Sequence, residues 1–237
     1  MAFDGNTSSL ENLEDIYQLS PMQQGMLFHT IYTPESGAYF EQTLFTIAGE
    51  LDVEMFERAW QQVVDRHSIL RSSFLWEELE RPQQVVHRRV RAPFEKLDWS
   101  DLPASVQEQR LANYIASDRA NGFDLATPPL MRLALFRFSD QLHRFVFSRH
   151  HLLIDRWSRS LLLKEVAAFY EALRKGAEPT LPPLRPYGDY IAWLDKQDQA
   201  AAEKFWRSSL AGFAAPTTLG IDKRISAGGA KDPTYGD

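Results

Sequence analysis

Two adjacent histidines followed by a carboxylate form the most reactive stretch of this sequence. His150 and His151 come directly after an apolar segment, and Asp155 follows them. An imidazole at the end of a strand can take up a proton or hydrogen-bond a substrate near neutral pH. Strand alternation places His151 on the face of Phe145 and Phe147, and His150 on the opposite face. The spacing alone leaves His151 open to a structural or a catalytic role, whereas we predict that His150 is hydrogen-bonded within the core.

Asp155 is expected to form an ion pair. A carboxylate between a strand and a helix can orient a neighbouring imidazole, but it pairs more often with a guanidinium group. Arg66 and Arg71 are the candidate partners. We predict that one of them binds Asp155 and fixes the loop after His151.

Several other reaction types lack the residues that they need. The chain has no cysteine, which excludes disulfides, thiol nucleophiles and Cys-ligated zinc. It also lacks the motifs of dinucleotide binding, P-loops, zinc proteases and the serine nucleophile elbow. Two opposed histidines do not supply the three converging ligands of a metal site. We therefore expect no metal and no covalently bound cofactor.

Composition narrows the class of protein. The chain has 237 residues, of which 44% are hydrophobic and 24% charged, which is typical of a folded globular protein. The net charge of −6 and the lack of a basic run argue against nucleic-acid binding. No apolar run approaches the roughly 18 residues of a membrane span, and residues 1–12 are acidic and polar, without the charged and apolar regions typical of a signal peptide. We expect a cytoplasmic protein without a membrane partner.

The elements that position the histidines alternate irregularly, which favours an α/β (α+β) fold with a mixed, largely antiparallel sheet flanked by helices. Strands are expected at 40–47, 70–76, 83–90, 130–138 and 142–148. Helices are expected at 21–31, 105–119, 187–194 and 200–210, after Asp52, and from Ser158 to Lys175. Predicted N-caps are Ser20 before Pro21, Asp52, Ser105 in a capping box with Glu108, and Ser158.

Four segments resemble motifs of nonribosomal peptide synthetase condensation domains, and they occur along the chain in the same order as in that family. His150 to Ser158 is similar to HHxxxDGxS, and Arg66 to Phe74 is similar to RHxxLRxxF. Tyr187 to Trp193 resembles YxDYxxW, and Ser20 to His29 resembles the first motif of the family, in the form of the D-donor subtype. The resemblance spans roughly residues 17–213. It implies a chloramphenicol acetyltransferase-like lobe.

The resemblance also implies a reaction and a set of site residues. The family forms an amide bond between a donor thioester and the α-amine of an acceptor, both carried on phosphopantetheine arms of partner peptidyl carrier proteins. His151 is the implied catalytic residue, acting by positioning first and as a general base second. The implied supporting residues are His150, Asp155, Arg66 and Arg71. The implied channel-lining residues are Ser20, Gln24, Arg156, Trp157 and Ser158.

The chain departs from the family in two respects. Family members are about twice as long, so the chain resembles an amino-terminal lobe and implies a second lobe as a partner. The expected organisation is a flexible leader at 1–13, the lobe at 14–178, a proline-rich connector with short helices at 179–213 and a flexible tail at 214–237. Arg156 replaces the motif glycine. Its side chain is expected either to bend back to Asp155 or another carboxylate, or to cross the channel, and in both cases to lower activity.

Three other functions remain as alternatives. A stand-alone acyltransferase of the chloramphenicol acetyltransferase type would use coenzyme A. A non-catalytic lobe would only fold or dock a partner. An epimerisation domain shares the two histidines, but the segment from Ser20 to His29 argues against it.

Overall fold

The computed structural model describes residues 11–215. The expected leader and tail therefore lie almost entirely outside the described residues. The strands are β1 (Leu13–Gln18), β2 (Phe40–Ala48), β3 (Ser72–Leu75), β4 (Gln83–His87), β5 (Phe94–Asp98), β6 (Met131–Ser139) and β7 (Leu142–His150). The α-helices are α2 (Pro21–Tyr32), α3 (Val53–Arg66), α4 (Ala104–Asn121), α5 (Arg156–Lys175), α6 (Tyr187–Leu194) and α7 (Gln199–Ser209). Short 3-10 helices occur at η1 (Pro34–Ser36) and η2 (Ser68–Arg71).

The chain divides into two compact units, residues 1–195 and residues 196–237. The first unit holds every element up to α6. The described part of the second unit contains α7, whose N-cap Asp198 accepts the backbone N–H of Ala201 at 2.9 Å. All of the predicted site residues lie in the first unit.

The main sheet of the first unit has the strand order β2-β7-β6-β5. Strands β2, β7 and β6 are antiparallel neighbours, whereas β5 runs parallel to β6. A second sheet has the order β1-β4-β3 and is antiparallel throughout. The prediction of a mixed, largely antiparallel sheet with helices is confirmed, including the hairpins β3–β4 and β6–β7. Strands β1 and β5 were not predicted.

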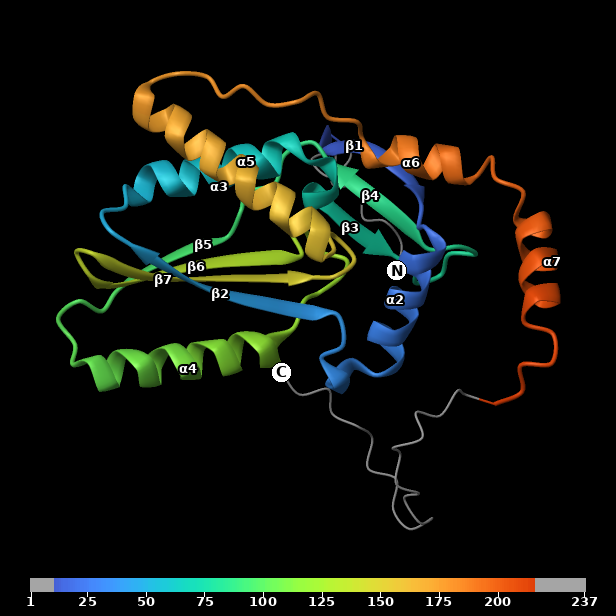
Figure 1. The fold of residues 1–237 in the computed structure, drawn as a ribbon, viewed down its shortest axis with the longest axis horizontal. Coiled ribbons are helices and arrows are strands. Elements are labelled where there is room, and N and C mark those ends of the chain that lie inside the picture. The colour runs from blue at the N-terminus through green and yellow to red at the C-terminus, as the bar shows by residue number, and fades with distance from the viewer. Residues whose placement is uncertain (1–10, 216–237) are drawn as a thin grey trace, which may run out of the picture. The chain divides into compact units, whose positions relative to one another are not determined.

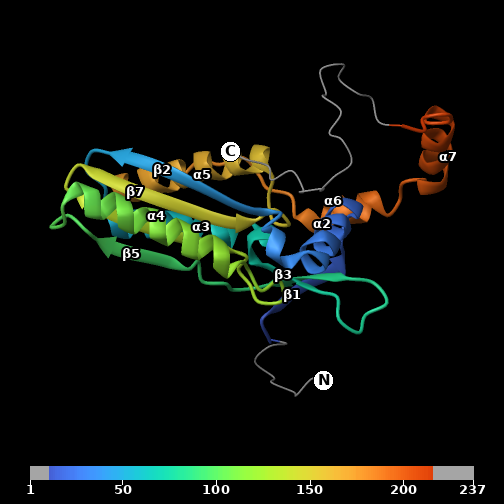
Figure 2. The same ribbon diagram turned by 90° about the horizontal axis from the view of Figure 1, so that it is seen from below.

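Helices cover both faces of the main sheet (Figures 1 and 2). Helices α3 and α5 lie side by side on one face, and α4 lies on the other. Phe145 and Phe147 of β7 pack towards α3, where the fully buried Trp60 has its ring 4.9 Å from that of Phe147. Val146 belongs to the smaller cluster beneath α4. Because both faces of β7 are covered, the strand delivers its last residues in a fixed orientation.

Two of the four predicted helix caps are confirmed. The Ser20 hydroxyl oxygen accepts the backbone N–H of Gln23 at 3.2 Å, and Gln23 Oε1 accepts the backbone N–H of Ser20 at 3.0 Å. Together the two bonds form a capping box. Asp52 accepts the Met55 amide at 2.9 Å. These side chains satisfy backbone N–H groups that have no partner inside the first helical turn.

The other two predicted caps are wrong. Helix α4 begins at Ala104, and its N-cap is Pro103, so Ser105 lies inside the first turn and no side chain caps the helix. Helix α5 begins at Arg156, and its N-cap is Asp155 rather than Ser158. In both cases the helix starts earlier than predicted, so the serine lies beyond the N-cap position.

Candidate functional site

The two histidines stand at the end of β7 and face opposite sides of the main sheet. The register between β2 and β7 pairs Phe40 with His150 and Glu41 with Arg149. His150 and Phe40 line one hollow together with residues of α4, whereas His151 contacts Glu41 on the other side. The predicted divergence of the two imidazoles is confirmed.

His150 is buried and held as a neutral imidazole. Its Nδ1 atom accepts the backbone N–H of Leu152 at 3.2 Å, so the ring proton lies on Nε2. Nε2 is 3.2 Å from the hydroxyl of Thr30, which donates its own proton to the Met26 carbonyl at 2.8 Å. Burial, and secondarily the neighbouring His151, lower the pKa of His150 from 6.5 to about 4. This residue is hydrogen-bonded within the core, as predicted.

His151 keeps one side of its ring accessible. Nδ1 lies 2.9 Å from Glu41 Oε1, which is within ion-pair distance. The two groups are not aligned for a hydrogen bond. The Nδ1 atom is buried, yet the side chain as a whole is 28% exposed. The exposed part of the side chain therefore lies away from Nδ1.

Tyr39 also contacts His151, through its backbone and through its ring. Its carbonyl accepts the His151 backbone N–H at 2.8 Å, and the two rings stack with centroids 6.3 Å apart and planes inclined by 13°. Tyr39 has a φ of +67°, a left-handed conformation that costs a non-glycine residue on the order of 1–3 kcal/mol. The surrounding contacts hold this backbone where it meets His151. Neither Tyr39 nor Glu41 was predicted, because each reaches the site through tertiary structure.

The predicted ion pair between Asp155 and an arginine is wrong. Asp155 is exposed, and its Oδ1 accepts the Ser158 backbone N–H at 2.7 Å as the N-cap of α5. These hydrogen bonds with Ser158 hold the pKa of Asp155 below its usual value of 3.8. The carboxylate thus fixes the loop after His151 by starting a helix.

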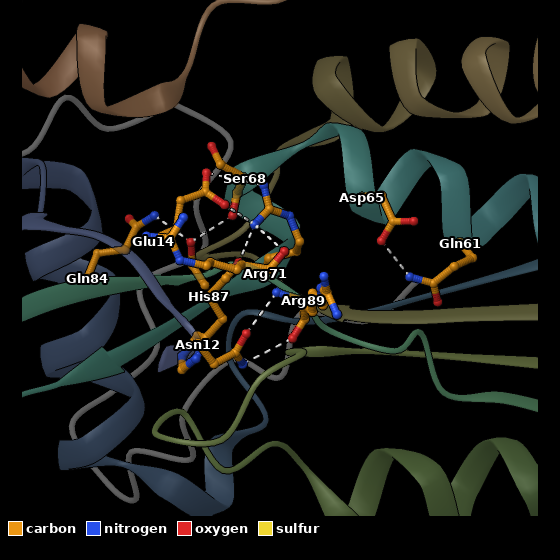
Figure 3. Close-up of polar contacts among 11 residues, drawn as sticks. Asn12, Glu14, Gln61, Asp65, Ser68, Arg71, Gln84, His87 and Arg89 are labelled. Atoms are coloured by element: carbon orange, nitrogen blue, oxygen red, sulfur yellow. Dashed lines mark hydrogen bonds and ion pairs between the residues drawn. The ribbon is translucent and has the colours of Figure 1, made fainter. Parts of the chain in front are cut away.

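The two arginines proposed as its partners brace other parts of the scaffold. Arg66 Nε donates to Glu165 Oε2 at 3.1 Å and so joins α3 to α5. Arg71 is nearly buried and donates to Glu14 at 2.5 Å and to the carbonyl oxygen of His87, which ties together strands of the small sheet (Figure 3). Both residues act at a distance from the histidine loop.

The α2 residues of the first motif have different environments. Ser20 is buried by its role in the capping box, and Gln24 is exposed with its amide donating to the Leu19 carbonyl at 3.0 Å. Their neighbour Gln23, which was not predicted, links α2 to the small sheet through Gln84 at 2.9 Å and to the histidine loop through the Leu152 carbonyl at 3.3 Å. Gln23 is the residue of this motif that touches the loop.

The three residues after Asp155 have different environments. Trp157 is 83% exposed, and Ser158 is half-buried with its amide bonded to Asp155. Arg156 makes no ion pair within residues 11–215, and it lines a hollow of about 450 Å³ beside Glu41. Of the two expected positions of the Arg156 side chain, the contact with Asp155 or another carboxylate is not formed among the described residues.

A second, larger hollow of about 900 Å³ adjoins His150. It lies between the segment from α2 to β2 and the end of α4 with the following loop. Its wall includes Thr30, Phe40, Arg119, Phe123 and His150. His150, already bound to Thr30, contributes to this wall without a free nitrogen.

Neither a metal centre nor a membrane span is found in residues 11–215. No group of three or more His, Cys, Asp or Glu side chains in this part of the chain is arranged to hold a metal ion. None of the helices described here is long and apolar enough to cross a membrane.

Comparison with solved structures of similar fold identifies the class of protein. The starter condensation domain of rhizomide synthetase superposes with a TM-score of 0.76 at 22% identity, over 86% of this chain and 50% of that one. The fold is thus that of one part of a condensation domain. The chain matches the Condensation domain family over residues 13–234 and belongs to this family.

Curated relatives agree with this assignment. A linear gramicidin synthase protein of Brevibacillus parabrevis is 47% identical over 215 residues, which cover 91% of this chain and 4% of that protein. A plipastatin synthase protein of Bacillus subtilis (strain 168) is 40% identical over 207 residues, covering 87% of this chain and 8% of that protein. The chain spans about half of the solved domain and less than a tenth of either synthetase. These matches favour the condensation-domain prediction over a stand-alone acyltransferase.

Proposed function

We propose that this chain is the first half of a condensation domain that joins two carrier-bound substrates through an amide bond. The observation that carries the proposal is the partly exposed side chain of His151, which is 28% exposed although its Nδ1 is buried beside Glu41. An imidazole presented in this way suits hydrogen bonding to an amine and proton transfer from it. Family membership supports the class of reaction.

In the proposed reaction the acceptor's α-amine attacks the carbonyl carbon of the donor thioester. The C–N bond forms, the C–S bond breaks, and the donor's thiolate leaves. Nε2 of His151 accepts a hydrogen bond from the amine, takes up the proton that the amine loses and returns it to the thiolate. An α-amine titrates near pH 8, so on the order of a tenth of it is already neutral at pH 7. Positioning of the amine is therefore the first role of His151, and proton removal is the second.

The remaining motif residues have supporting roles in this proposal. His150 anchors the loop through Leu152 and Thr30, and Asp155 anchors it by capping α5. Arg66 and Arg71 keep the surrounding elements in place.

The partners follow from what the chain lacks. Without a cysteine or a carrier-type attachment serine, it holds neither substrate covalently. We place the substrates on phosphopantetheine arms of donor and acceptor peptidyl carrier proteins, with a second lobe closing the channel. A cysteine-free chain fits the reducing cytoplasm. The D-donor subtype stays a prediction.

The test compares two histidines in a complete condensation domain that contains this chain. Donor and acceptor carrier proteins are loaded, and amide formation is followed by mass spectrometry of the intact carriers. His151→Ala is expected to lower the rate by about 100-fold or more, in the range of general acid–base catalysis. The matched control is His67→Ala, which removes another histidine that contacts a carboxylate, Glu165, at 2.7 Å. Equal rates for the wild type and His151→Ala, with unchanged melting temperatures, would refute the proposal.

A further inference from the structure

Four arginines line a hollow next to Glu41, the residue that contacts His151. The hollow has a volume of about 450 Å³ and lies at the meeting point of β2, the end of β7, the first turn of α5 and the end of α4. It is lined by Phe40, Glu41, Gln42, Thr43, Arg119, Arg149, Arg156 and Arg159. Glu41 is the single carboxylate of this lining, so the walls carry an excess of positive charge.

Glu41 does not neutralise this charge, because it is shared. One carboxylate oxygen pairs with Arg149, and the other lies 2.9 Å from Nδ1 of His151. Among residues 11–215, Arg119 and Arg156 form no ion pair. The hollow therefore lacks counter-charge on the walls that Glu41 does not reach.

Arg149 and Arg159 each have a buried Nε–H group without a hydrogen-bond partner among the described residues. The side chain of Arg149 is only 2% exposed. Burial lowers the pKa of Arg149, and Arg159 lowers it further, although Glu41 acts in the opposite direction. An anion in the hollow would offset the mutual repulsion of these guanidinium groups.

We propose that this hollow binds the side-chain carboxylate of an acidic aminoacyl substrate, glutamyl or aspartyl, while its reacting group lies at His151. The inference rests on the proposed function and adds a substrate class to it. A side-chain carboxylate is only a few bonds from the α-amine and the carbonyl carbon, and Glu41, which lines the hollow, lies 2.9 Å from Nδ1 of His151. The phosphate of the carrier arm does not match, because the full length of the pantetheine chain separates it from the thioester.

Binding is measured on a complete condensation domain that contains this chain. The probes are 2-acetamidoethyl amides of glutamate and glutamine, in which an amide replaces the thioester and the side-chain charge is the only difference. Probes with a free α-amine represent the acceptor, and N-acetylated probes represent the donor. Isothermal titration is expected to give at least about tenfold tighter binding of the glutamate probe than of the glutamine probe in one of the two series. The series that discriminates identifies the substrate that enters the hollow.

Arginine variants test whether these residues cause the preference for the glutamate probe. Arg156→Gln combined with Arg159→Gln is expected to reduce the preference to about twofold or less. If the double variant has a lower melting temperature, Arg156→Gln alone is used, because Arg156 is exposed and makes no ion pair among the described residues. The matched control is Arg174→Gln on the same helix, an exposed arginine paired with Glu171 at 3.5 Å, which is expected to leave the preference unchanged.

Two results would overturn the proposal. Equal binding of both probes in both series would mean that the hollow takes no carboxylate from the substrate, as when a carboxylate of the other half of the domain fills it. A preference that survives in the arginine variants would place the acidic site elsewhere. Because binding is measured without turnover, a domain that forms amides but shows no preference refutes only this inference. A domain that prefers glutamate but forms no amide refutes only the proposed function.

Discussion

Glu41 approaches the imidazole of His151 to 2.9 Å from the strand beside β7. The two residues are more than a hundred positions apart in the sequence and meet because β2 pairs with β7 from Phe40 to Ala48. The carboxylate lies beside the buried Nδ1, and the reaction proposed above uses the other ring nitrogen, Nε2. This contact gives His151 a defined orientation.

The first prediction concerns that orientation. In a complete domain, Glu41→Gln is expected to lower kcat for amide formation by about tenfold with little change in KM, because the imidazole loses its charged partner while the substrate site persists. Glutamine still offers an oxygen to Arg149, which limits unfolding. The control is Glu54→Gln, which removes an exposed carboxylate paired with Lys96 at 2.8 Å. A rise in KM alone, with unchanged kcat, would contradict a positioning role.

The second prediction concerns Asp155, which acts as the N-cap of α5 and not as a member of a buried ion pair. Asp155→Ala is expected to lower the free energy of unfolding by about 1 kcal/mol, the usual contribution of an N-cap, rather than the roughly 3–5 kcal/mol of a broken buried pair. Urea denaturation of the purified chain measures this difference. Asp155→Asn should restore most of the stability, and Asp52→Ala, at the N-cap of α3, should show a similar loss. A loss above about 3 kcal/mol would bring the ion pair back into consideration.

The third prediction follows from the pKa of His150. Its folded value of about 4 is below the ordinary 6.5, so the unfolded state binds more protons between these values. The stability from the neutral imidazole is complete above about pH 6.5 and is lost as the pH falls towards 4, by about 3 kcal/mol in total. The measurement is the free energy of unfolding of the wild type and of His150→Gln at about pH 7.5 and about pH 5. Parallel pH dependences of the two proteins would show that His150 is not held neutral.

The fourth prediction concerns the residue that replaces the motif glycine. Arg156→Gly, in a complete domain with loaded neutral substrates, is expected to raise the rate of amide formation severalfold, because a charged side chain leaves the hollow next to Glu41. Glycine in the first turn of α5 should cost about 1 kcal/mol of stability, which thermal unfolding reports. Equal rates for the arginine and glycine forms would mean that Arg156 is tolerated there.

Local sequence patterns predicted the elements that depend on local physics. Ser20 before Pro21 and Asp52 before an apolar helix both marked true helix starts. The alternation of Phe145, Val146 and Phe147 predicted the two buried faces of β7, and from them the divergence of His150 and His151. These features could be predicted because backbone periodicity alone determines them.

Features that depend on distant partners could not be predicted in this way. Arg66 binds Glu165 and Arg71 binds Glu14, and with 32 acidic residues in the chain no local signal singles out either partner. Predicting that Glu41 lies at the site would have required knowing the register of β2 on β7. Strand β5 is a short edge strand whose Glu95 and Lys96 are exposed, so its apolar pattern is too weak to reveal it.

The consecutive histidines impose a limit on chain length within β7. Because successive residues of a strand point to opposite faces, deleting or inserting one residue between the β6–β7 turn and His150 would exchange the two rings. The histidine that now binds Thr30 would face Glu41, and the other would enter the core with its hydrogen bonds unmet. We expect this hairpin to tolerate changes in side chains more readily than changes in its number of residues. Chimeric domains should therefore be joined outside residues 131–150.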